Sequence, residues 1–404
     1  METSKSNKGS LLGAILLIAG CCIGAGMLGL PVLSSLAGFI PSTILFICSW
    51  LFMMCTGLLL LEVNLWYGDG VNLITMTGRT LGRIGQALSW LLFLFLFYSI
   101  MVAYVAGSGS LFSDIYEEMV GTKIELWKAS LTFVVLFGVV IYTGALNVDW
   151  FNRILMLGLI ITYVALIILG LPKVKLELLA HADWPKVALV VPAMIISFGY
   201  HNLIPGLTTY LNHDVKKLRT AIIVGSSLPL LVYLLWQYVI MGVIPVGQFQ
   251  EALDQGAMAT HALKNAAGSS WVLIFAEYFA FFSIVTSFLA VAFSFVDFLS
   301  DGLSIKKSAS GMVLLCLLTL VPPFVFALSY PQIFLTALNY AGAFGAVILF
   351  GIFPALMVWV GRYRLKKVGR EILPGGRLTL IAVIAVALTI VALQFVQEIG
   401  WVHL

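Results

Sequence analysis

Charge is scarce in this sequence. Only 10% of its 404 residues are Asp, Glu, Lys or Arg, 61% are hydrophobic, and the mean hydropathy is +1.07. Soluble domains carry about 25% charged residues, so this chain lacks the polar surface that a water-soluble fold needs. Gly9–Leu61 has no charged residue over 53 positions. The scarcity excludes a soluble protein and predicts an all-α polytopic membrane protein.

Metal-ligating and nucleophilic groups are also few. The spans lack the clustered His, Asp or Glu that a membrane enzyme needs, and their polar residues are too sparse for the continuous pore of a channel. No disulfide or metal-site spacing occurs among the five cysteines, which lie in apolar runs at positions 21, 22, 48, 55 and 316. We therefore expect no enzyme activity, no cofactor and no nucleic-acid partner.

The apolar runs predict eleven transmembrane helices. One span takes about 20 residues, so each of two long runs holds two helices. Gly9–Leu61 divides near Gly38–Pro41, and 308–361 divides at Ser329–Pro331. The single spans lie near 87–113, 129–148, 154–172, 187–211, 220–246, 270–296 and 378–397.

The basic residues predict how these helices are oriented. With the N-terminus inside, 16 of the 22 Lys and Arg residues fall on the inner side. Such a bias favours a cytoplasmic N-terminus, and eleven spans then place the C-terminus outside the cytoplasmic (inner) membrane. Residues 1–8 lack a signal-peptide cleavage pattern, so we expect the first helix to be retained.

A glycine motif interrupts the first span. Gly24–Gly29, GAGMLG, matches the dinucleotide-binding pattern G-x-G-x-x-G. That pattern has meaning only between a strand and a helix, and here it lies inside an apolar run with no acidic residue about 20 positions later. The glycines instead favour unwinding of the helix, which must then line a cavity because bare backbone is costly in lipid. Close packing against another helix is the alternative.

A second interrupted span follows at repeat spacing. Pro192–Leu207, PAMIISFGYHNLIPGL, contains several poor helix formers, and its Pro205 follows Pro31 by 174 residues. Paired broken helices predict an inverted repeat, with five helices in 1–172, five in 173–361, and a basic loop plus the eleventh helix in 362–404. Freed N–H groups suit a carboxylate and freed carbonyls suit an ammonium or a cation, so a zwitterionic amino acid fits both.

Few ionisable or hydroxyl groups lie within the spans, and each has two interpretations. His201 either accepts the coupled proton or bonds the substrate, or it is a neutral histidine that is hydrogen-bonded to freed backbone groups. Glu277 is a proton carrier or the partner of an external lysine. Thr286 and Ser287 complete a cation site, or bond their own helix carbonyls. Glu62, near the inner interface, is expected to be structural or to close a gate, pairing with a basic loop residue.

Four stretches carry a family resemblance. At GAGMLGLP, LLLLEV, SFGYHNLIPGLTTYL and KKLRTAIIVGSSLPLLVYLLWQ the chain resembles the hydroxy and aromatic amino acid permeases, with bacterial tyrosine-specific and tryptophan permeases nearest. The glycine motif recurs across the amino acid–polyamine–organocation superfamily. The helix 6 stretch and the KKLR loop favour the aromatic branch over the serine and threonine branch.

The resemblance implies a leucine-transporter-type fold, with a five-plus-five inverted repeat, one extra C-terminal helix, and breaks in helices 1 and 6. It also implies uptake driven by a proton, with sodium as the alternative coupling ion and the only metal expected. Substrate backbone contacts then fall on Ile23, Gly24, Ala25, Gly26, Met27, Ser197, Phe198, Gly199 and Tyr200. A sodium ion would use Gly20, Ile23, Thr286 and Ser287, whereas His201 and Glu277 are the proton candidates.

The expected substrate is an aromatic amino acid, with tyrosine first and a serine or threonine symporter as the alternative. Tyr104 and Phe198 are predicted to flank the ring, although packing is an equal explanation for Tyr104. Asn339 and Tyr340 are predicted to meet a phenolic hydroxyl or an indole N–H. We expect the protein to act as a monomer in the lipid bilayer.

Overall fold

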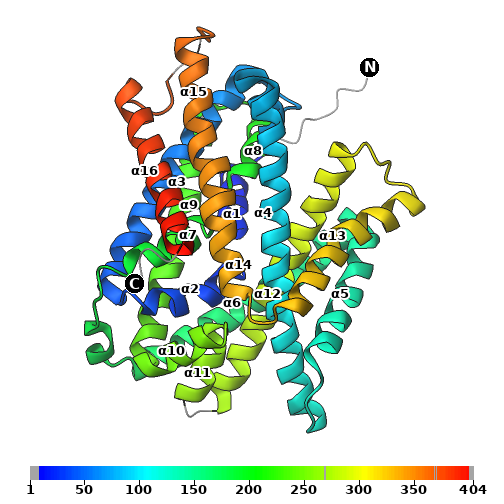
Figure 1. The fold of residues 1–404 in the computed structure, drawn as a ribbon, viewed down its shortest axis with the longest axis vertical. Helices are drawn as coiled ribbons and strands as arrows, with labels where there is room; N and C mark the ends of the chain where they lie inside the picture. The colour runs from blue at the N-terminus through cyan, green and yellow to red at the C-terminus, as the bar shows by residue number, and fades with distance from the viewer. Residues whose placement is uncertain (1–8, 268–269, 368, 370, 400–404) are drawn as a thin grey trace.

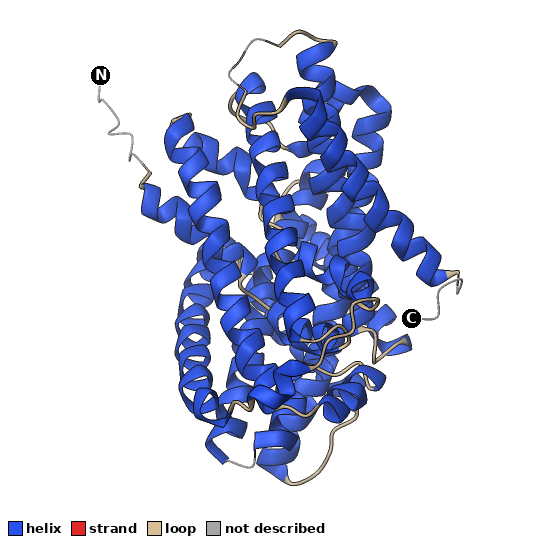
Figure 2. Cartoon of the chain, turned by 90° about the vertical axis from the view of Figure 1, so that its left-hand side faces the viewer, coloured by secondary structure: helices blue, strands red, loops and turns tan. Residues whose placement is uncertain are grey.

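The computed structural model describes residues 9–267, 270–367, 369 and 371–399. Within these residues the chain is helical, and its only β pairing is an isolated bridge between Gly38 and Ala182 (Figure 2). The predicted all-α class is therefore confirmed. The terminal residues 1–8 and 400–404, on which the prediction of terminal orientation depends, lie outside the described residues.

The first half of the chain forms six long elements and two short ones. They are α1 (Leu11–Cys22), α2 (Gly26–Ser35), α3 (Phe39–Tyr67), α4 (Leu73–Val120), α5 (Leu126–Tyr142), α6 (Ala145–Gly170), η1 (Leu171–Lys173) and η2 (Leu176–Ala180).

The second half begins with a broken span and ends with a single helix. Its elements are α7 (Val187–Ile196), η3 (His201–Leu203), α8 (Ile204–Tyr210), α9 (Val215–Val243), α10 (Val246–Asp254), α11 (Ala259–Ala267), α12 (Ser270–Gly302), α13 (Ala309–Ser329), α14 (Phe334–Tyr340), the π-helix η4 (Ala341–Ile352), α15 (Phe353–Tyr363) and α16 (Gly376–Glu398).

Length and composition allow nine of the described helical segments to cross a membrane, or ten when α1 and α2 count as one bent span. The apolar helix α5 has 17 residues and is shorter than those spans. The chain is thus a multi-pass membrane protein. The count of eleven, the inverted repeat and the three-part division at residues 172 and 361 stay predictions.

The bundle has two ends, which we name after a residue on each. The Asp69 face is the end that holds the connections from α3 to α4 and from α8 to α9, and α8 and α15 mark it at the top of Figure 1. The Gln332 face is the opposite end, where α10 and α11 lie (Figure 1). Four helices have side-chain caps that bond their first N–H groups: Ser10 caps α1, Asn72 caps α4, Asp214 caps α9 and Ser308 caps α13.

Asp69 joins two connections on its face. Thr209 donates a hydrogen bond to Asp69 Oδ1, and His213 Nε2 lies 3.1 Å from the same oxygen. These bonds, first that of Thr209 and then that of His213, hold the pKa of the Asp69 carboxyl below its ordinary value. The link ties the α3–α4 connection to the one between α8 and α9.

We predict that this link gives a small, pH-dependent stabilisation. A lowered folded-state pKa contributes stability above the unfolded value, and that stability is lost as the pH falls through the folded value. Between about pH 5 and about pH 3, the melting temperature of the wild type should therefore fall more than that of Asp69→Asn. Equal falls in the two proteins would contradict the prediction.

Candidate functional site

The first span is broken at the glycine motif. α1 ends at Cys22, α2 begins at Gly26, and the two axes differ by 55°. Ile23 is extended, with φ −75° and ψ 108°, so the helical hydrogen bonds stop there. The freed backbone N–H of Ala25 donates to Ser287 Oγ of α12 at 2.8 Å. The predicted break in helix 1 is present, and α12 supplies a polar partner for it.

The second break lies beside the first. α7 ends at Ile196, and the chain resumes as a helix only at His201. Ser197 follows Ile23 by the 174 residues that the repeat predicted. The Cys21 thiol of α1 contacts the Gly199 carbonyl at 3.7 Å, so the two breaks meet.

Two residues of α9 hold the breaks together, and sequence reasoning missed both. The Tyr233 hydroxyl donates to the Cys22 carbonyl and lies 3.0 Å from the Ser197 carbonyl. Trp236 Nε1 donates to the Met27 carbonyl at 3.0 Å. Both side chains are fully buried, and the only signal for them was their spacing of three in an apolar run.

A central cavity of about 120 Å³ lies between the breaks. One side is lined by the predicted residues Gly24, Ala25, Gly26, Ser197 and Gly199, together with Ser287. The rest of the lining includes the predicted Tyr104 and rings that sequence reasoning did not single out, namely Phe93, Phe97 and Phe350. Exposed backbone thus faces a cluster of aromatic rings.

Glycine is needed at the first break because the backbone approaches α12 closely. A Cβ on Gly24 would collide with Ser287 Oγ. A Cβ on Gly26 would stand 3.3 Å from Ser197 Oγ, which is tighter than an ordinary contact. The motif therefore provides close approach between the broken segments and α12, besides allowing the helix to unwind.

Three predicted residues of the second break pack around the central cavity without lining it. Phe198 packs edge-on against Tyr233, with ring centroids 5.4 Å apart. Tyr200 donates to the Met53 carbonyl at 3.2 Å. His201 places Nε2 2.9 Å from Thr56 Oγ1 and stacks on Phe350 at 4.8 Å. None of the three lines the central cavity, and His201 is one ring removed from it.

The predicted residues of helix 10 lie away from the cavity. The Tyr340 hydroxyl donates to Glu398 Oε2 of α16 at 2.8 Å, and Asn339 does not line the cavity either. Helix 10 instead presents Leu338 and Phe350 to it. Tyr340 follows Leu338 by two residues on the α-helix α14, which places its side chain on the opposite face of the helix.

The predicted ion-binding groups are only partly assembled. Thr286 donates to the carbonyls of Phe282 and Ser283 at 2.8 and 3.1 Å, so its hydroxyl is bonded within its own helix. Ser287 faces the break. Gly20 lies on α1 with Met156 as its neighbour, and neither Ile23 nor Met27 lines the central cavity.

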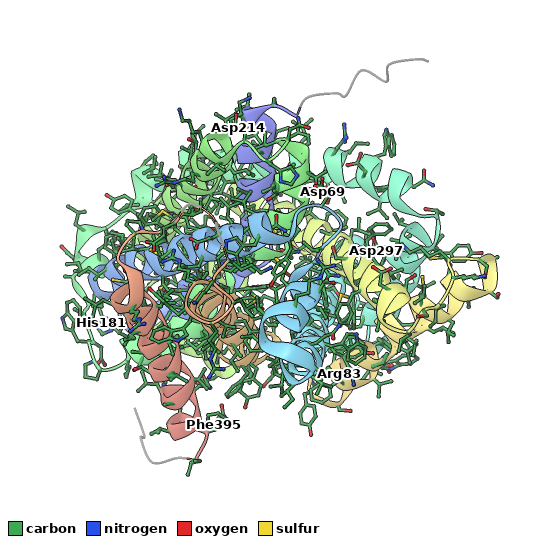
Figure 3. The ribbon with its side chains drawn as sticks, turned by 90° about the horizontal axis from the view of Figure 1, so that it is seen from above. Asp69, Arg83, His181, Asp214, Asp297 and Phe395 are labelled. Atoms are coloured by element: carbon green, nitrogen blue, oxygen red, sulfur yellow. The ribbon has the colours of Figure 1, made fainter. Side chains whose placement is uncertain are left out.

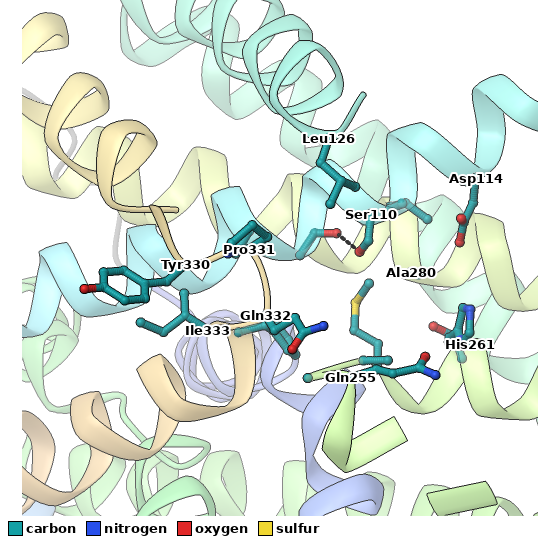
Figure 4. A pocket seen from close by; sticks show the side chains of 18 of the residues that line it. Ser110, Asp114, Leu126, Gln255, His261, Ala280, Tyr330, Pro331, Gln332 and Ile333 are labelled. Atoms are coloured by element: carbon teal, nitrogen blue, oxygen red, sulfur yellow. Dashed lines mark hydrogen bonds between the residues drawn. The ribbon is translucent and has the colours of Figure 1, made fainter. Parts of the chain in front are cut away.

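Glu277 lies in a second and larger cavity of about 890 Å³ at the Gln332 face. Asp114, His261 and Gln332 also line this vestibule, and Figure 4 shows the residues gathered around it. Phe334 lines the vestibule and Leu338, one turn later on α14, lines the central cavity. The ring of Phe334 also packs against Gly107, so this turn of α14 separates the two spaces.

Glu62 has the basic partner that the sequence predicted. Arg362 Nε and Nη2 donate to the two Glu62 carboxylate oxygens, each at 2.7 Å. The pair joins the final turns of α3 and α15 near the Asp69 face.

Comparison with known proteins gives one consistent result. The tryptophan/tyrosine permease family model matches residues 7–394. The chain is 32% identical to the tyrosine-specific transport system 1 of Haemophilus influenzae, over 96% of this chain and 98% of that relative. It is 28% identical to the tryptophan-specific transport protein of the same organism, over 97% of each chain, and 30% identical to that of Pseudomonas aeruginosa, over 89% and 88%. These relatives are transport proteins and not enzymes. The chain belongs to the tryptophan/tyrosine permease family.

Proposed function

We propose that the protein imports an aromatic amino acid, with tyrosine as its first substrate, by proton symport through alternating access. The observation that carries the proposal is the central cavity, where the exposed backbone of two broken helices faces Phe93, Phe97, Tyr104 and Phe350. The printed names of the relatives, tyrosine-specific and tryptophan-specific, support the aromatic class.

The two sides of the cavity suit the two ends of such a substrate. Backbone N–H groups at the start of α2 favour a carboxylate, and carbonyls at the end of α1 favour an ammonium. The rings of α4 and η4 then receive the side chain by edge or face contacts. Binding sites commonly measure about 300 Å³ or more, so the 120 Å³ cavity must widen by movement of these rings.

The vestibule and the central cavity support alternating access. The vestibule belongs to the Gln332 face, and the turn of α14 at Phe334 separates it from the central cavity. In the proposed orientation the Asp69 face is cytoplasmic, so the vestibule receives the external substrate. Movement of α14 relative to α4 would then connect the two spaces.

Uptake of labelled tyrosine into vesicles containing the purified protein tests this function. We expect accumulation that stops when the membrane is made permeable to protons. Tryptophan and phenylalanine should compete with tyrosine, and serine should compete poorly, because a ring fills an apolar pocket that a hydroxymethyl group leaves empty. Competition by serine or threonine equal to that by tyrosine would assign the hydroxy amino acid branch instead.

The coupling ion has its own prediction. In sodium-free buffer an imposed proton gradient should still drive uptake, and Thr286→Ala should leave the sodium response unchanged, because the Thr286 hydroxyl is bonded to carbonyls of its own helix. Strict dependence on sodium, weakened by Thr286→Ala, would replace the proton with sodium and return Thr286 and Ser287 to a cation site.

A further inference from the structure

A third cavity, a groove of about 690 Å³, lies where α4 resumes after Gly82 and α12 ends. It is lined by Arg83, Gln86, Ala87, Trp90 and Leu91 of α4, and by Gly302 and Leu303. Gly82, at φ 78°, breaks the helical path just before Arg83. Figure 3, which looks down on the Asp69 face, places Arg83 towards the edge of the bundle.

The groove offers hydrogen-bond donors that the protein does not use. Among the described residues, the Arg83 guanidinium has no ion pair or hydrogen bond, and the indole N–H of Trp90 has no acceptor. Trp90 is held in place by stacking on Phe298, with centroids 5.6 Å apart, and by resting on Gly302, where a side chain would collide with it. Arg83 is the only charged residue among the described residues that line the groove.

The rest of the surface is apolar. Ile84 is 77% exposed and Leu91 56%, and Leu88 and Leu303 are also exposed beside them. Arginine and tryptophan at the end of a membrane span are typical of the headgroup region, and leucines nearer the membrane centre face acyl chains. The groove therefore offers a cation and a fixed indole N–H beside an apolar strip. A ligand that fits both must have an anionic headgroup and a hydrocarbon chain.

We propose that this groove binds an anionic phospholipid. The lipid phosphate accepts hydrogen bonds from Arg83 and Trp90, and one acyl chain lies along Ile84, Leu88 and Leu91. The lipid is anionic, because the described residues of the lining include one cation and no acid. Since α4 and α12 also line the central cavity, the lipid bridges two helices of the transport site from outside.

Native mass spectrometry of the purified protein, titrated with phosphatidylglycerol or phosphatidylcholine, tests the proposal. We expect tighter retention of phosphatidylglycerol, and Arg83→Gln should weaken that retention by about fivefold, the effect of one basic residue at an anionic surface. Trp90→Phe, which keeps the stacked ring and removes the N–H, should also weaken it. Arg153→Gln is the matched control, because Arg153 is exposed and pairs with Asp149 on α6.

Three results would overturn the proposal. They are equal retention of phosphatidylglycerol by wild type and Arg83→Gln, equal retention of the neutral and anionic lipids by the wild type, and full displacement of the lipid by glycerol phosphate, which would assign a soluble phosphate ligand. An unchanged melting temperature of Arg83→Gln in lipid-free detergent would show that the variant is folded.

Discussion

Gly24→Ala should weaken tyrosine binding by about a hundredfold while the protein still folds and inserts. The added Cβ would occupy the position of Ser287 Oγ, which accepts the hydrogen bond of the freed Ala25 N–H at 2.8 Å. Either the backbone of the break shifts, or Ser287 rotates and leaves that N–H unbonded. Overpacking and a lost buried hydrogen bond each cost about 1–3 kcal/mol, so affinity should fall by about a hundredfold.

Two further variants make this result specific. Gly206→Ala is the matched control, because no atom lies within 4 Å of the added Cβ, and its binding should be normal. Gly24→Ala combined with Ser287→Ala removes the collision but not the loss of the acceptor, so it should recover part of the affinity. Equilibrium binding of labelled tyrosine measures all four proteins. Normal binding by Gly24→Ala, or no recovery in the double variant, would contradict the close-approach argument.

The breaks themselves were predictable because glycine and proline act locally. Three glycines in one apolar run, and a second interrupted run 174 residues later, identified both places where the backbone leaves the helix. Which carbonyls and N–H groups become free follows from helix geometry alone. Five of the nine predicted backbone positions therefore line the central cavity, namely Gly24, Ala25, Gly26, Ser197 and Gly199.

The aromatic side could not be predicted in the same way. In a membrane protein a phenylalanine ring packs equally well against lipid, against the core or into a cavity. The residue type of Phe97 therefore does not predict which of these its ring faces. Tyr340 follows Leu338 by two residues on the α-helix α14, so the two side chains point to opposite faces, and Leu338 is the one that lines the central cavity. Tyr233 was missed because its partners, the Cys22 and Ser197 carbonyls, are distant in sequence.

For Glu62 the local sequence predicted the kind of partner but not which residue it is. Its position at the end of an apolar helix predicted a basic partner. The partner is Arg362, which lies 300 residues later, and the sequence offered many basic residues for that role. Only the folded arrangement of α3 against α15 selects one of them.

Removing either member of this pair should destabilise the protein strongly. The Glu62 and Arg362 side chains are only 3% and 8% exposed, and both N–H···O bonds between them are 2.7 Å long. Glu62 Oε2 also accepts the backbone N–H of Ile372 at 2.8 Å, and Arg362 donates to the Leu373 carbonyl. The pair thus holds the connection from α15 to α16 against the end of α3.

Arg362→Gln should cost about 3–5 kcal/mol of stability, because it leaves the buried Glu62 carboxylate without its cation. Glu62→Gln should cost less, because Arg362 keeps a second carboxylate, Glu371, whose Oε2 lies 3.3 Å from Nη1. Thermal unfolding in detergent measures the loss, and Arg364→Gln, at an exposed neighbouring position, should change little. The double variant should lose less than the sum of the two single losses, because it leaves neither charge buried alone. Strictly additive losses would show that the two side chains stabilise the protein independently. The ion pair would then not be the contact that holds the α15–α16 connection against α3.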